Sequence, residues 1–118
     1  MRYVRLYAGP DGESHFEDVE TASSSSLGPI DLLATLPVSL MRFVSTEGSY
    51  DRSWHNAPLR QYVVTLSGWW EIEVSDGETR RFGPGSVLLA EDTQGKGHVN
   101  KVDGPTERLM IHAADAGQ

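Results

Sequence analysis

The sequence is built from short stretches in which polar and apolar residues alternate, separated by clusters of glycine, proline, aspartate and serine. Alternation with a period of two is typical of strands that bury one face. The predicted strands cover residues 2–9, 14–20, 39–46, 61–68, 69–77, 78–82, 85–92 and 107–115. Asp76-Gly77 predicts a tight hairpin between two of them. No segment predicts a long helix, so we expect an all-β antiparallel sandwich or barrel.

Residues 21–37, "TASSSSLGPIDLLATLP", break this pattern, because a serine run leads into a short apolar segment between two prolines. Two interpretations remain. The segment is either a flap over a pocket or a surface connection with one helical turn at residues 30–36. The surface connection is the more common use of such a segment.

The composition narrows the functions that the chain can have. A length of 118 residues predicts a single domain, residues 1–118, with one core. Ten Lys and Arg against seventeen Asp and Glu give a net charge of −7, so neither nucleic acid nor an anionic membrane is an expected partner. The absence of cysteine excludes disulfides and thiolate ligands. No stretch approaches the roughly 20 apolar residues of a membrane span, and no secretion signal is seen, so a cytoplasmic location is expected.

One stretch, "SWHNAPLRQYVVTLSG", suggests a site. His55, Ala57 and Gln61 share one parity, so on an extended strand their side chains would point to one face. With Gly68, this spacing resembles the first motif of the cupin family, G-x5-H-x-H-x3-E-x6-G. Ala57 stands at the second histidine and Gln61 at the glutamate.

A second stretch, "GSVLLAEDTQGKGH", resembles the second cupin motif, G-x5-P-x-G-x2-H-x3-N. Gly85 opens it, Glu91 stands at the proline, and His98 is the histidine after two extra residues. Val102 falls at the final asparagine, with Asn100 nearby. The resemblance is to small single-domain cupins, covers about residues 40–113, and implies a jelly-roll barrel.

In cupins these motifs converge on a divalent metal inside the barrel, commonly zinc, nickel, manganese or iron. The resemblance therefore implies that His55, Gln61 and His98 would be the metal ligands here. The set is incomplete, because Ala57 has no donor atom and Gln61 offers a neutral amide where the family has a carboxylate. Such a set predicts weak binding unless Asp92 or Glu91 assists. Tight binding, weak binding and a metal-free pocket all remain open.

Other side chains have structural or binding interpretations. Tyr50 and Trp54 flank the predicted mouth and could stack on a flat ligand. Arg60 has the opposite parity to Gln61 and is expected at the surface or at a subunit interface. Trp69 and Trp70 should point to opposite faces, one into the core and one outward.

Two further histidines and one loop complete the candidates. His15 and His112 lie in predicted strands and are expected to be structural, although His112 could reach the barrel interior. The segment "GKGH", residues 95–98, lacks the spacing of a phosphate-binding loop. Its glycines are expected to allow a backbone path that brings His98 over the barrel.

Three functions are compatible with these residues. The first is a barrel that binds a small polar or aromatic molecule, with His55 and His98 as catalytic residues in isomerase, epimerase or lyase chemistry. The second is a non-catalytic barrel that binds or senses a metabolite, and the third is a metal-dependent dioxygenase. A homodimer is expected, because small barrels commonly pair exposed edge strands, and the N-terminal strand is a natural element to add to a neighbour's sheet.

Overall fold

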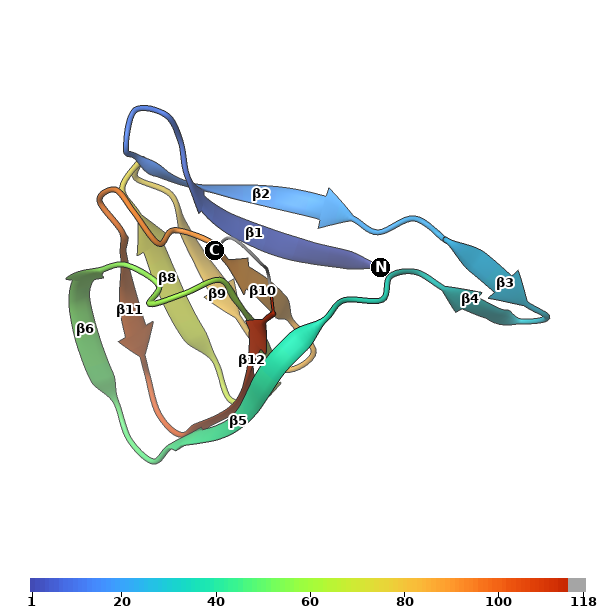
Figure 1. Cartoon of the computed structure of the whole chain (residues 1–118). Coiled ribbons are helices and arrows are strands. Elements are labelled where there is room, and N and C mark those ends of the chain that lie inside the picture. The colour runs from blue at the N-terminus through green and yellow to red at the C-terminus, as the bar shows by residue number, and fades with distance from the viewer. Residues whose placement is uncertain (115–118) are drawn as a thin grey trace.

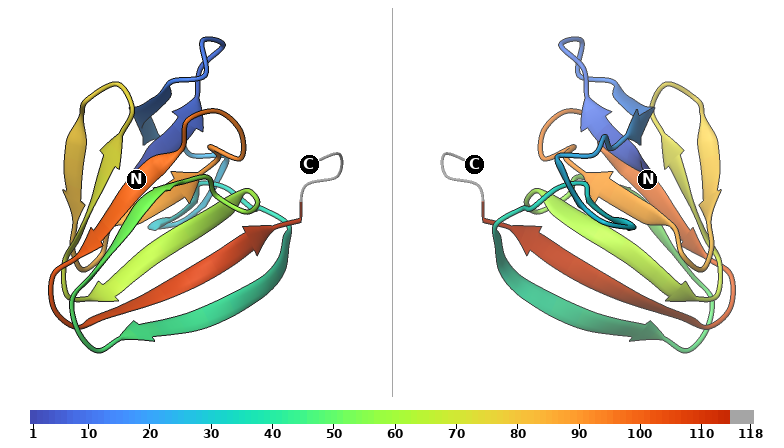
Figure 2. Two further views of the ribbon diagram at one scale, coloured as in Figure 1. Left: turned by 90° about the vertical axis from the view of Figure 1, so that its left-hand side faces the viewer. Right: turned by 90° about the vertical axis from the view of Figure 1, so that its right-hand side faces the viewer.

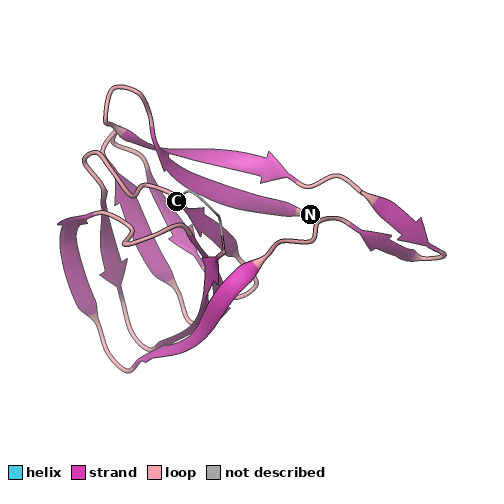
Figure 3. Cartoon of the chain, viewed as in Figure 1, coloured by secondary structure: helices cyan, strands magenta, loops and turns pink. Residues whose placement is uncertain are grey.

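Two β-sheets and one projecting hairpin form the regular structure of the chain in the computed structural model, which describes residues 1–114 (Figure 1). Figure 3 shows strands and loops only, and no helix occurs in this part of the chain. The strands are β1 (Arg2–Ala8), β2 (Ser14–Glu20), β3 (Ser25–Leu27), β4 (Ile30–Leu32), β5 (Val38–Thr46), β6 (Tyr50–His55), β7 (Gln61–Ser67), β8 (Trp70–Val74), β9 (Thr79–Phe82), β10 (Val87–Ala90), β11 (His98–Val102) and β12 (Thr106–Ala113).

The last eight strands have the pairing of a jelly roll. The larger sheet has the order β2-β1-β10-β7-β12-β5 and the smaller one the order β6-β11-β8-β9. The first of the eight, β5, thus pairs with the last, β12, and the second, β6, pairs with the seventh, β11. Figure 2 shows β12, in red, between β7 and β5 of the larger sheet. This nesting confirms the predicted all-β jelly roll, and the fold is cupin-like.

Strand β1 differs from the prediction in two respects. It pairs antiparallel with β2 and parallel with β10, so the larger sheet is not antiparallel throughout. Because β1 is hydrogen-bonded on both sides, it has no free edge to add to a neighbour's sheet. The outer strands of the two main sheets are β2, β5, β6 and β9.

The apolar core lies between the sheets. Its buried members come from both sheets: Leu6, Phe16, Val63, Trp70, Ile72, Val74, Phe82, Leu88 and Val102. Trp70 is only 3% exposed, whereas its neighbour Trp69 is 48% exposed, which confirms their opposite orientations. The buried indole donates a hydrogen bond from Nε1 to Thr65 Oγ1 at 2.9 Å, so its polar atom is satisfied inside the core.

Residues 21–37 form an arm that projects from the body (Figure 1). The predicted helical turn at residues 30–36 is wrong, because β3 and β4 form a hairpin in which Leu27 pairs with Ile30. Gly28, at a φ of +60°, and Pro29 make the connecting turn, and proline cannot donate a helical hydrogen bond. The arm lines no part of the cavity described below, which excludes a flap over it in this conformation.

The predicted last strand reached residue 115, which lies outside the described residues. Within residues 1–114, no helix has the length and apolar character needed to cross a membrane.

Candidate functional site

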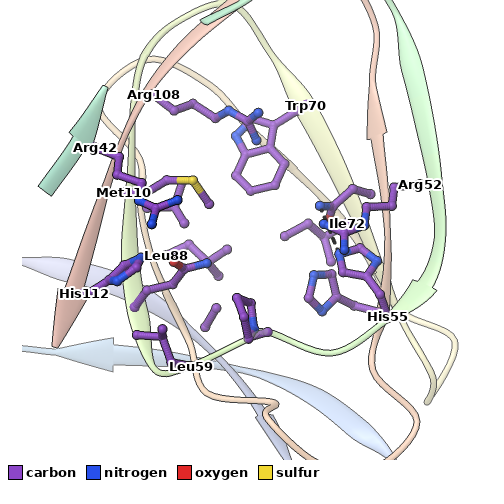
Figure 4. A pocket seen from close by; sticks show the side chains of 17 residues that line it. Arg42, Arg52, His55, Leu59, Trp70, Ile72, Leu88, Arg108, Met110 and His112 are labelled. Carbon is purple, nitrogen blue, oxygen red and sulfur yellow. Dashed lines mark hydrogen bonds between the residues drawn. The ribbon is translucent and has the colours of Figure 1, made fainter. Parts of the chain in front are cut away.

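A cavity of about 290 Å³ lies between the two sheets. Side chains from both sheets line it, and they include His55, Gln61 and His98 (Figure 4). Core members Val63, Trp70, Ile72 and Leu88 also border it. Ligand pockets commonly measure about 300–1,000 Å³, so this one suits a small molecule.

His55 and His98 meet across neighbouring strands. They are directly opposite each other in the β6–β11 ladder, and their ring centroids are 4.4 Å apart. His98 is only 5% exposed. The structure thus brings together two imidazoles that are far apart in the sequence.

Gly97 makes this approach feasible. Its φ is +76°, and a Cβ at this position would lie 2.2 Å from the carbonyl oxygen of His55. Only glycine allows both the left-handed backbone and so close a contact. The expected role of the loop at residues 95–98 is therefore confirmed for Gly97.

A buried carboxylate holds the ring of His98. Nδ1 of His98 lies 2.5 Å from Oδ2 of Asp92, and the Asp92 side chain is fully buried. Asp92 does not line the cavity, so it lies behind the ring rather than beside a ligand. The Nδ1 proton of His98 is donated to this carboxylate, which leaves Nε2 as the atom free for chemistry.

The second imidazole is oriented by the backbone. Nδ1 of His55 lies 2.7 Å from the carbonyl oxygen of Ser53, and a carbonyl can only accept, so Nδ1 carries the proton. Nε2 of the neutral ring then has a free lone pair, 3.5 Å from Nδ2 of Asn100. Burial lowers the pKa of His55 below its ordinary value of 6.5, and the nearby His98 and Arg52 lower that pKa further.

The segment between the two motif positions is not a continuous strand. Strand β6 ends at His55, and β7 begins at Gln61. The prediction of one extended face from residue 55 to 61 is therefore wrong, and Pro58, within the connecting loop, is incompatible with an interior strand. Ala57, within the loop, and Gln61, at the start of β7, nevertheless both line the cavity.

The donor set does not fit a tightly held divalent cation. The residues 1–114 contain no group of three or more His, Cys, Asp and Glu side chains placed to hold an ion. The donors that line the cavity include the imidazoles of His55, His98 and His112 and the amide of Gln61, whereas no Asp or Glu lines it. Three arginines line it instead, and their charge opposes that of a cation.

The remaining predicted site residues lie elsewhere. Tyr50 and Trp54 are 37% and 48% exposed and do not line the cavity, so their positions do not support stacking on a ligand inside it. Glu91 contacts Nε of Arg5 and of Arg60, on the side of the chain away from the cavity. Arg60 lies outside the cavity, as its parity predicted.

Of the other two histidines, one pairs with an aspartate outside the cavity and the other lines the cavity. Nδ1 of His15 lies 2.8 Å from Oδ2 of Asp76, away from the cavity, which agrees with a structural role. His112 is 8% exposed and lines the cavity, so it reaches the interior.

Sequence reasoning missed the arginines of the cavity: Arg42, Arg52 and Arg108. A signal for one of them was present. On β12, Arg108 stands at alternate positions with Thr106, Met110 and His112, so it occupies the same inward face as these residues. A charged side chain on the inward face of a strand rarely stabilises the fold, because burying a charge costs free energy.

Comparison with known proteins supports the fold and nothing finer. No protein-family profile and no curated protein sequence matches the chain. The SPY1581 protein of Streptococcus pyogenes, whose function is unknown, has a TM-score of 0.51 at 22% identity, over 64% of this chain and 65% of that one. The NMB1881 protein of Neisseria meningitidis has a TM-score of 0.50 at 13% identity, over 75% and 92% of the two chains.

A third structure covers more of the chain but is less similar in shape. It is the Salmonella typhimurium protein described as ethanolamine utilization protein Q, which covers 98% of both chains at 14% identity. Its TM-score of 0.43 is too low to carry an argument. This chain is thus similar in fold to structures of low sequence identity, and its topology is that of a small cupin-like barrel.

Proposed function

We propose that the barrel binds a small polar organic molecule and catalyses proton transfer on it, as in an isomerase, epimerase or lyase. The observation that carries the proposal is the pairing of His55 and His98 at the wall of one cavity, each with Nδ1 engaged behind the ring. In both rings, Nε2 is therefore the nitrogen that can exchange a proton with a ligand. Two imidazoles at this spacing can serve as base and acid on one ligand.

The surroundings of the two rings support a different role for each. Burial lowers the pKa of His55, so this ring is neutral at neutral pH and acts as the base. The Asp92 carboxylate beside His98 balances a positive charge on that ring, so His98 acts as the acid.

The step balances without a co-reactant. Nε2 of His55 accepts a proton from a carbon next to a carbonyl or carboxylate, and the C–H electron pair moves into that group. In an isomerisation, His98 gives its Nε2 proton to the carbonyl oxygen of an α-hydroxy carbonyl compound, and the enediol so formed takes a proton at the neighbouring carbon and releases its other hydroxyl proton. In a lyase reaction, the electron pair instead expels a leaving group from the next carbon, and His98 protonates that group. An oxygen-activating iron site is less well supported, because such sites need three strong donors placed together, and residues 1–114 hold no such group although His112 also lines the cavity.

The test is hydrogen exchange with solvent. Untagged protein is incubated in D2O with a panel of small sugars, hydroxy acids and keto acids, and deuterium incorporation at carbon is followed by NMR. We expect exchange on at least one compound and its loss in His55→Gln and in His98→Asn. His15→Gln is the matched control, because this histidine also contacts an aspartate but lies outside the cavity.

Binding without exchange would favour the alternative, a non-catalytic metabolite-binding or sensing barrel. That result would contradict the catalytic proposal while leaving the cavity as a binding site. Elemental analysis of the same untagged preparation measures its metal content. A full equivalent of zinc, nickel, manganese or iron would contradict the conclusion that the donor set does not fit a tightly held ion.

A further inference from the structure

The Lys and Arg side chains differ in whether a carboxylate partner balances their charge. Of the ten Lys and Arg side chains, six form ion pairs with carboxylates: Arg2, Arg5, Arg60, Arg80, Arg81 and Lys96. The other four are Arg42, Arg52, Lys101 and Arg108, and no ion pair joins them to residues 1–114. Three of these four line the cavity. Most of the Lys and Arg side chains without an ion pair to residues 1–114 are therefore gathered around one cavity.

Arg108 is the most informative of the three. It is only 5% exposed, and its guanidinium lies 4.7 Å from the centroid of the Trp70 ring. Nη2 donates a long hydrogen bond of 3.4 Å to Oγ1 of Thr46, and Nε is buried without a partner. Burying a guanidinium without a carboxylate carries a desolvation cost that a stacked ring offsets only in part. An anionic ligand would supply the missing partner.

A second unsatisfied atom belongs to another residue that lines the cavity. Oδ1 of Asn100 is buried without a hydrogen-bond partner, while Nδ2 of this amide lies 3.5 Å from Nε2 of His55. An amide oxygen accepts only, so its partner must be a donor such as a hydroxyl. Arg108 thus lacks an anionic partner, and the amide oxygen of Asn100 lacks a hydrogen-bond donor. One ligand that carries both groups could supply them.

We propose that the cavity binds a small hydroxylated carboxylic acid, whose carboxylate lies on Arg108 and whose hydroxyl donates to Asn100. This inference rests on the proposed function in one respect, that His55 and His98 act on the same molecule. Figure 4 shows Arg108 and Trp70 at one end of the cavity and His55 on a wall farther along it. Arg42 and Arg52 lie on facing walls, are exposed, and attract the anion to the cavity.

The shape of the donors favours a carboxylate. A guanidinium presents parallel N–H groups that match the two oxygens of a planar carboxylate. The apolar side chains of Ile72, Leu88 and Met110 suit a short carbon skeleton beside the charged group. The volume of about 290 Å³ limits that skeleton to a few carbons.

The test is calorimetric binding of matched probes. Glycolate, lactate and malate are each compared with the uncharged amide of the same acid, and with inorganic phosphate. We expect at least one hydroxy acid to bind about ten-fold or more tightly than its amide and than phosphate, since a tenfold change corresponds to about 1.4 kcal/mol. Equal binding of acid and amide would overturn the proposal, and so would Arg108-dependent binding of phosphate that is as tight as that of any acid.

Two arginine variants separate a binding role from a structural one. Arg108→Met keeps an apolar chain against Trp70 and removes the charge. We expect it to weaken binding of the hydroxy acid about ten-fold or more and to leave the melting temperature equal or higher, because an uncompensated buried charge is removed. Arg81→Met is the matched control, since this guanidinium also lies over a tryptophan, 5.0 Å from the ring centroid of Trp69, but outside the cavity.

The outcomes are distinct. A lower melting temperature for Arg108→Met with unchanged affinity would show that Arg108 only stabilises the fold, and it would overturn the inference. Arg108-dependent binding of a hydroxy acid without deuterium exchange would support the inference and contradict the catalytic proposal. Exchange on uncharged compounds that is unaffected in Arg108→Met would do the reverse. Asn100→Asp should also weaken binding, because it places a negative charge near the anion.

Discussion

At the residue scale, the site depends on which nitrogen of each ring carries a proton. Two acceptors decide this, the carbonyl of Ser53 behind His55 and the carboxylate of Asp92 behind His98. The first acceptor is neutral and the second is charged. This difference makes the two rings chemically unequal although they lie side by side.

The titration of His55 is predictable in direction. Because burial lowers its pKa, we expect its ring resonances in NMR to titrate with a midpoint below the ordinary value of 6.5. Between that midpoint and pH 6.5 the unfolded chain holds more protons than the folded one, so the contribution of His55 to stability rises with pH in this window and falls as the solution is acidified. Urea unfolding of the wild type and of His55→Gln at several pH values isolates the contribution. A midpoint at or above 6.5 would contradict the expectation.

At the element scale, the contact between the 95–98 loop and β6 holds the two histidines together. The loop ends at Gly97, whose Cα faces the backbone of His55. A change that widens this contact would separate the rings without touching either of them.

Gly97→Ala tests the contact. The new Cβ meets the His55 carbonyl in a left-handed backbone, so we expect a loss of stability clearly larger than the roughly 1–3 kcal/mol that strain alone costs. Gly12→Ala is the control, because Gly12 has a similar φ of +84° but nothing within 4 Å of an added Cβ. Chemical denaturation of both variants measures the difference. Equal losses would mean that strain alone, and not the contact, makes glycine necessary at residue 97.

The strands of the jelly roll were predictable, and the path of the connections was not. Alternation identifies β7, β8 and β12 because one face of each is buried. It does not reveal where a strand ends, so the loop between His55 and Gln61 was missed although both residues were correctly expected in the interior. The parallel pairing of β1 with β10 joins distant segments, which local patterns do not encode.

The chemical character of the cavity was harder to predict than its location. The motif positions identified His55 and His98, because histidines at fixed spacing stand out in a sequence. Arg108 did not stand out, since an arginine in a strand usually faces solvent and only its shared parity with His112 indicates otherwise. Because the sequence was searched for residue types that bind metal ions, arginines such as Arg108 were not considered.

At the scale of the whole molecule, apolar surface remains uncovered. Leu27 and Ile30 on the arm are 76% and 63% exposed, and Phe43 on the edge strand β5 is 79% exposed. An apolar groove lies on the outer side of the larger sheet, between side chains that include Tyr62, Val64, Leu36 and Ile111. Patches of this kind commonly mark protein interfaces. The homodimer expected from the sequence remains a prediction. The arm, rather than β1, is now the element that we expect at its interface.

Sedimentation velocity over a range of protein concentrations checks this prediction. We expect a dimer for the wild type and weaker association for Leu27→Ser combined with Ile30→Ser, because these side chains then lose their apolar contact area. Leu66→Ser, at a residue that is 50% exposed on β7, is the control. A monomer at all concentrations would contradict the homodimer. If Leu66→Ser alone dissociated the dimer, the interface would lie on the larger sheet and not on the arm.

The ladder between β6 and β11 has one more consequence. The hydrogen bonds that join these strands also set the spacing between the imidazoles, and a shift of one residue along either strand would turn one ring to solvent. A barrel that closed out of register would therefore lack the imidazole pair on which the proposed proton transfer depends. For this chain, correct pairing of β6 with β11 completes the smaller sheet and assembles the proposed site at the same time.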